Sequence, residues 1–72
     1  MLTKQDKIDI IESHKKNLEY TRYNLEVSLL QENARVKINQ VAIDTLQQQI
    51  DEIDAQKLVL DAEIVSINAA TE

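Results

Sequence analysis

The chain has 72 residues, of which eight are Lys or Arg and thirteen are Asp or Glu, and it contains no glycine, proline or cysteine. Without glycine and proline it lacks the residues that usually form turns and strand boundaries, which argues against a mixed or all-β fold. The absence of cysteine excludes disulfides and thiol chemistry. We therefore predict an all-α protein in which residues 1–72 form a single helical coiled-coil unit.

The helix should begin near residue 3 or 4. Thr3 followed by Asp6 resembles a capping box in which Asp replaces the usual Glu. A carboxylate in the first turn also complements the positive end of the helix dipole.

From there an apolar pattern with a seven-residue period runs almost to the end of the chain. In one a/d register, 13 of 18 positions are apolar, whereas the 43% hydrophobic content would place about eight there by chance. Such a pattern is typical of helices that pack along a continuous seam. We call the 18 a/d positions the seam and expect its 13 apolar residues to mediate oligomerisation: Ile8, Ile11, Leu18, Leu25, Leu29, Val36, Ile43, Leu46, Ile50, Ile53, Leu60, Ile64 and Ile67.

The remaining five seam positions are polar. Such residues cost stability but can fix register or partner choice, and long basic side chains can also lie along a seam with their charged ends in water. Both interpretations remain open for Lys15, Arg22, Glu32, Asn39 and Lys57.

Two arrangements are compatible with the seam. Because the register passes through residues 31–39 without slipping, we favour one uninterrupted helix that self-associates in parallel. The alternative is an antiparallel helical hairpin with a turn near residues 31–35, where Asn33 could adopt the left-handed conformation at a helix end. The hairpin would pair Leu29 with Val36, Leu18 with Leu46, and Ile11 with Ile53.

A second apolar stripe lies about 150° around the helix from the seam. It either packs inside a larger helical bundle or docks on another protein, since tyrosines combine an apolar ring with a polar tip. Its spacings are 3, 4, 3, 4 and 7, and its members are Tyr20, Tyr23, Val27, Leu30, Ala34 and Val41.

No pattern in the sequence predicts chemistry. A glycine-rich phosphate loop requires glycine, and the single histidine, His14, has no second histidine or cysteine to share a metal ion. We expect no catalytic residues, cofactor or metal site, and no small-molecule substrate. The longest apolar runs in the sequence have three residues, which is too short for a membrane span, so we expect none. The start of the chain is charged, so we expect no signal peptide.

The function expected from these features is structural. We predict an assembly or protein-protein interaction subunit that self-associates through the seam and docks on further helices, such as a minor component of a virion or a cytoplasmic assembly. One alternative is a small adaptor or inhibitor that completes a target's helical bundle. The other is a nucleic-acid-directed protein, which the net charge of −5 disfavours.

Overall fold

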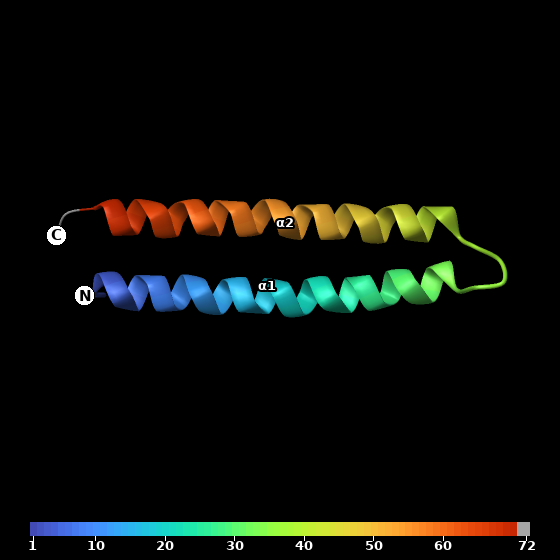
Figure 1. Cartoon of the computed structure of the whole chain (residues 1–72), viewed down its shortest axis with the longest axis horizontal. Coiled ribbons are helices and arrows are strands. Elements are labelled where there is room, and N and C mark those ends of the chain that lie inside the picture. Colours follow the sequence, from blue (N-terminus) through green and yellow to red (C-terminus); the bar gives the residue numbers. More distant parts are fainter. Residues whose placement is uncertain (71–72) are drawn as a thin grey trace.

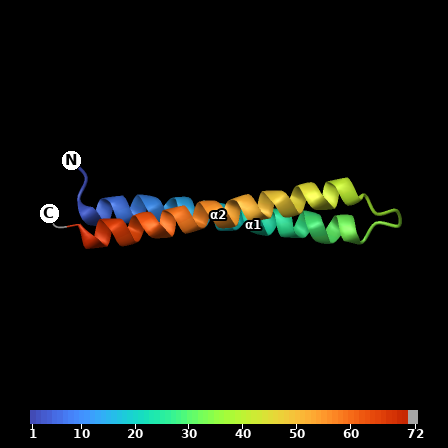
Figure 2. The ribbon, with the colours of Figure 1, turned by 90° about the horizontal axis from the view of Figure 1, so that it is seen from above.

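The computed structural model of the protein describes residues 1–70 and is an all-α hairpin. Helix α1 (Lys4–Asn33) and helix α2 (Gln40–Ala69) run antiparallel and are joined by a loop at residues 34–39 (Figure 1). The start of α1 and the end of α2 lie together at one end of a rod with extents of 58 × 15 × 14 Å. Seen from above, the helices cross once at a shallow angle near the middle of the rod (Figure 2), as helices with an a/d seam do.

Helix α1 begins where the sequence predicts. The Thr3 side chain accepts a hydrogen bond from the Asp6 backbone N–H at 3.0 Å, and the Asp6 carboxylate accepts one from the Thr3 backbone N–H at 3.0 Å. The capping box is therefore confirmed with Asp in the Glu position. The hydrogen bonds from the Thr3 backbone and side chain lower the pKa of Asp6, because they favour its ionised form.

The chain reverses later than the hairpin alternative predicts. Helix α1 continues to Asn33, and Ala34 caps it in a right-handed conformation; among the described residues none has a positive φ. The Asn33 side chain instead donates to the Leu29 carbonyl at 3.0 Å. Asn39, expected in the seam, caps α2 by accepting from the Ala42 backbone N–H at 3.2 Å.

The uninterrupted helix that we favoured is wrong, and the hairpin is confirmed. Register continuity is no argument against a loop, because each helix carries its own a/d pattern. Leu29 and Ile43 are consecutive helical a positions on either side of the loop, and they lie two whole heptads apart in the sequence. The a/d numbering therefore continues unchanged across a segment that is not helical.

The seam forms the contact between α1 and α2. Ile50 and Ile53 form its centre, with 3% and 7% of their surface exposed. One apolar seam residue is misplaced by the sequence pattern: Val36 lies in the loop and is fully exposed. The others are partly buried: Ile8, Ile11, Leu18, Leu25, Leu29, Ile43, Leu46, Leu60, Ile64 and Ile67.

The pairs expected for the hairpin are also corrected. Leu18 lies beside Gln56, Val59 and Leu60, and Leu46 lies nearer the loop beside Ser28 and Glu32. Ile11 shares its surroundings with Ile67 instead of Ile53, and Leu29 cannot pair with the exposed Val36. The cause is the position of the loop, whose centre lies several residues further along the chain than a turn at 31–35.

Candidate interaction surfaces

One side of the α1–α2 contact is closed by ion pairs. In each pair a cation at an a position of the seam meets a carboxylate at an e position of the opposite helix. The Lys15 amine lies 2.5 Å from the Asp61 carboxylate. The Lys57 amine lies 3.6 Å from the Glu19 carboxylate. We call this side, formed by the a, b and e positions, the ion-pair face.

Arg22 makes the most extensive contact of this face. Its guanidinium donates from Nε and Nη2 to the two carboxylate oxygens of Asp54, at 2.8 and 3.3 Å, and also pairs with Glu26 of its own helix. This two-pronged geometry is specific to arginine. The hydrogen bond from Arg22 lowers the pKa of Asp54, and the hydrogen bond that Lys15 makes to Asp61 raises the pKa of Lys15.

The Arg22–Asp54 pair gives a pH prediction. Because the folded pKa of Asp54 is depressed, its contribution to stability is complete above the unfolded value of 3.8 and is lost as the pH falls through the folded pKa. Asp54→Asn should therefore lower the melting temperature at pH 7, and the difference from the parent should shrink as the pH falls below 3.8.

Thermal denaturation followed by circular dichroism at several pH values measures this difference. Asp44→Asn is the matched control, because the Asp44 carboxylate accepts a hydrogen bond from Gln40 of its own helix. A gap between Asp54→Asn and the parent that stayed constant down to pH 2 would contradict the assigned pair.

The opposite side of the contact is hollowed. Three hollows lie in a row between the helices, with volumes of about 220, 420 and 480 Å³ from the chain ends toward the loop. Apart from Leu2, every residue that lines them occupies a c, d or g position of the heptad. We call this side, formed by the c, d and g positions, the groove face.

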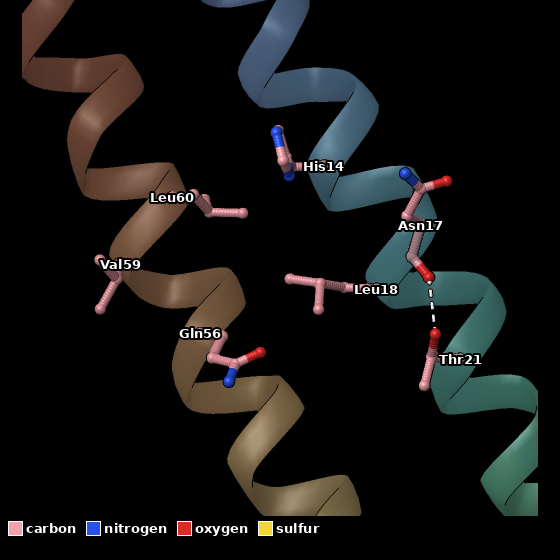
Figure 3. Close-up of a pocket in the computed structure, with 7 residues that line it drawn as sticks. All are labelled: His14, Asn17, Leu18, Thr21, Gln56, Val59 and Leu60. Atoms are coloured by element: carbon pink, nitrogen blue, oxygen red, sulfur yellow. Dashed lines mark hydrogen bonds between the residues drawn. The ribbon is translucent and has the colours of Figure 1, made fainter.

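The central hollow shows how the groove face is built. Leu18 of α1 and Leu60 of α2 point toward each other and form its apolar floor (Figure 3). Its rim carries uncharged side chains such as Thr21 and Gln56, and the Thr21 hydroxyl donates to the Asn17 carbonyl at 3.0 Å. His14 lies on the same rim. The seam is therefore open to solvent on this side.

The second stripe lies on the surface of the hairpin. Tyr20, Tyr23, Leu30 and Val41 are between 63% and 76% exposed. Ala34 is exposed as the cap of α1, and Val27 is partly buried. The α1 members occupy b and f positions, at the outer edge of the ion-pair face, so the second stripe is separate from the groove face.

A third apolar stripe was missed by the sequence interpretation. It lies on α2 toward the chain ends, and Leu58 and Val65 within it are 70% and 67% exposed. Its spacings of 3, 4, 3 and 4 repeat the first four spacings of the second stripe, and this periodicity could have revealed it. It consists of Ala55, Leu58, Ala62, Val65 and Ala69.

The described residues leave several large apolar side chains exposed on the surface of the hairpin. No group of three or more His, Cys, Asp or Glu among residues 1–70 is placed to hold a metal ion. Neither helix is long and apolar enough to cross a membrane.

Comparisons with other proteins do not extend this description. No protein-family model, curated protein or solved structure matches the chain. The two faces and the exposed stripes are therefore the features from which a function is inferred.

Proposed function

We propose that this chain is a protein-protein interaction subunit that self-associates into a helical bundle and attaches to a larger assembly. The observation that carries the proposal is the small core of the isolated hairpin. Only Ile50 and Ile53 are buried among the described residues, while two apolar stripes and the groove face are exposed. Such a chain gains stability chiefly by covering these surfaces with other helices.

The exposed area supports association quantitatively. The chain exposes 5550 Å², whereas a compact monomer of 8.3 kDa exposes about 4,600 Å². The excess is about 950 Å² per chain, which exceeds the roughly 800 Å² that each partner contributes to a standard stable interface. A single interface of ordinary size would therefore bring the protein to the exposure expected for its mass.

Attachment to a larger assembly is assigned to the second stripe. Tyr20, Tyr23 and Leu30 combine large apolar area with two polar tips, the composition that is enriched in interfaces. Their position at the outer edge of the hairpin leaves them accessible when helices cover the groove face. The role is structural, as in a minor component of a virion or another multi-subunit particle.

A second candidate function is favoured by the hairpin itself. A small adaptor or inhibitor that completes a target's helical bundle would be a folded hairpin when alone and would form a defined 1:1 complex with its target. The two functions differ in what the purified chain does in the absence of any partner.

Self-association is tested on the purified chain. We expect circular dichroism to show a predominantly helical protein, and light scattering to give a multiple of the 8.3 kDa chain mass. The variant Tyr23→Lys with Leu30→Glu should keep the parent's mass but fail to co-purify with the larger assembly from the native source. A helical monomer would refute self-association and leave the adaptor as the better candidate.

A further inference from the structure

We propose that a second copy of this chain docks on the groove face, so that two hairpins form a four-helix bundle with the ion-pair faces turned outward. This inference rests on the proposed self-association and identifies the surface that carries it. A twofold axis in the interface would pair each groove face with itself, as in most homodimers.

The groove face is continuous with the core between α1 and α2. The d positions face the groove, and within the two helices seven of nine are apolar: Ile11, Leu18, Leu25, Leu46, Ile53, Leu60 and Ile67. The three basic residues of the seam are all at a positions on the other side. A helix pair laid along the groove would therefore extend the α1–α2 core, as in four-helix bundles.

The rim of the groove is suited to close approach. Most of the side chains that line the central and loop-side hollows are uncharged and several are short, including Thr21, Ser28 and Ala42. The charged residues of the three hollows are Glu32 near the loop and Lys7 and Glu63 near the open end. Two larger apolar residues on the same side, Ile10 and Val59, are 46% and 68% exposed. These residues would be covered by the second copy.

The net charges of the two faces favour the groove face as the interface between two copies. Within the helices, the a, b and e positions carry four cations and eight carboxylates, a net charge of −4. The c, d and g positions carry Lys4 and Lys7 against Glu32, Glu52 and Glu63, a net charge of −1. Two copies in contact through their ion-pair faces would bring together two surfaces that each carry a net charge of −4. The two surfaces would be separated by no more than about one Debye length, so their repulsion would be little screened. Contact through the groove faces opposes net charges of only −1 and so weakens this repulsion.

The size of the face fits the area to be covered. The rod is 58 Å long and 15 Å wide. One broad face therefore measures roughly 900 Å², which is close to the roughly 800 Å² that each partner of a stable dimer contributes. It also matches the excess exposure of the chain. One groove face is large enough to account for self-association, without any contribution from the second stripe.

Charge introduced at the middle of the groove tests the assignment. Thr21 and Gln56 lie on the rim of the central hollow, near the midpoint of each helix, so either orientation of the second copy places them at the centre of the interface. The groove variant is Thr21→Glu with Gln56→Glu. The matched control, Ser13→Glu with Gln48→Glu, adds the same charges at exposed f positions away from the groove.

Sedimentation equilibrium should give twice the 8.3 kDa chain mass for the parent and the control. The groove variant should dissociate at least about tenfold more readily, since a charge buried in an interface without a partner is strongly unfavourable. Circular dichroism on the same samples reports whether the hairpin remains helical.

A charge-reversed partner keeps the test decisive if the groove variant also loses helicity. The variant Thr21→Lys with Gln56→Lys should dissociate like the Glu variant, and mixing the two should restore a helical species of dimer mass. A Glu variant that dimerises as tightly as the control, or a mixture that does not recover the dimer, would overturn the groove assignment while self-association stands. A monomeric parent would instead refute the proposed self-association itself.

Discussion

Replacing both Ile50 and Ile53 by alanine should abolish the cooperative unfolding transition of the protein. These are the two most buried residues described, with 3% and 7% of their surface exposed. Truncation of a buried isoleucine to alanine costs about 2–5 kcal/mol. The pair therefore removes about 4–10 kcal/mol from a chain whose stability, at this size, is at most about 5–15 kcal/mol.

The matched control removes the same number of carbon atoms from the surface. Leu30 and Leu58 are both 70% exposed, so replacing both by alanine should change the unfolding free energy by less than about 0.5 kcal/mol per residue. Urea denaturation followed by circular dichroism measures both variants. Equal unfolding midpoints for the Ile50/Ile53 variant and the parent would show that the α1–α2 contact lies elsewhere.

Much of the helical structure could be predicted from local patterns. Thr3 and Asp6 identify the start of α1 because a capping box is a short-range arrangement of two residues and the backbone between them. The seam residues could be predicted because burial in a helix contact follows the heptad period, whether the partner is another chain or the same chain folded back. Val36 departs from the pattern because it lies in the loop.

The reversal of the chain was harder to predict. Residues 34–39 contain no glycine or proline, and none of the described residues needs a positive φ. The one local signal is Asn39, a favoured residue at helix N-caps, and its d position in the heptad concealed it. The decision between a straight helix and a hairpin depends on contacts between distant residues, which periodicity alone does not describe.

The two faces became distinguishable only through the pairing of the helices. The sequence places Lys15, Arg22 and Lys57 in the seam but does not say which carboxylates meet them. In the structure all three bind e-position carboxylates of the opposite helix, which closes one side and leaves the other hollow. The third apolar stripe was overlooked for a simpler reason, since three of its five members are alanines, whose small side chains give a weak signal.

A covalent link between residues 4 and 68 should join the two ends of one chain and stabilise it strongly. The Lys4 amine donates a hydrogen bond to the Asn68 carbonyl at 3.2 Å, across the open end of the hairpin. The chain has no cysteine, so in Lys4→Cys with Asn68→Cys a short bis-maleimide reacts at these positions alone. Closing a loop of about 64 residues restricts the unfolded chain and should contribute about 4 kcal/mol.

Mass spectrometry and denaturation together separate the hairpin from the straight helix. In a continuous helix residues 4 and 68 would lie about 96 Å apart, and a short reagent could then join them only between chains, giving a product of twice the chain mass.

The control Lys4→Cys with Asn33→Cys places the thiols at opposite ends of α1, about 44 Å apart. It should form no internal link. The hairpin requires an internally linked 8.3 kDa chain at high dilution, with a raised unfolding midpoint. Linked dimers alone would contradict it, because the two ends would then belong to different molecules.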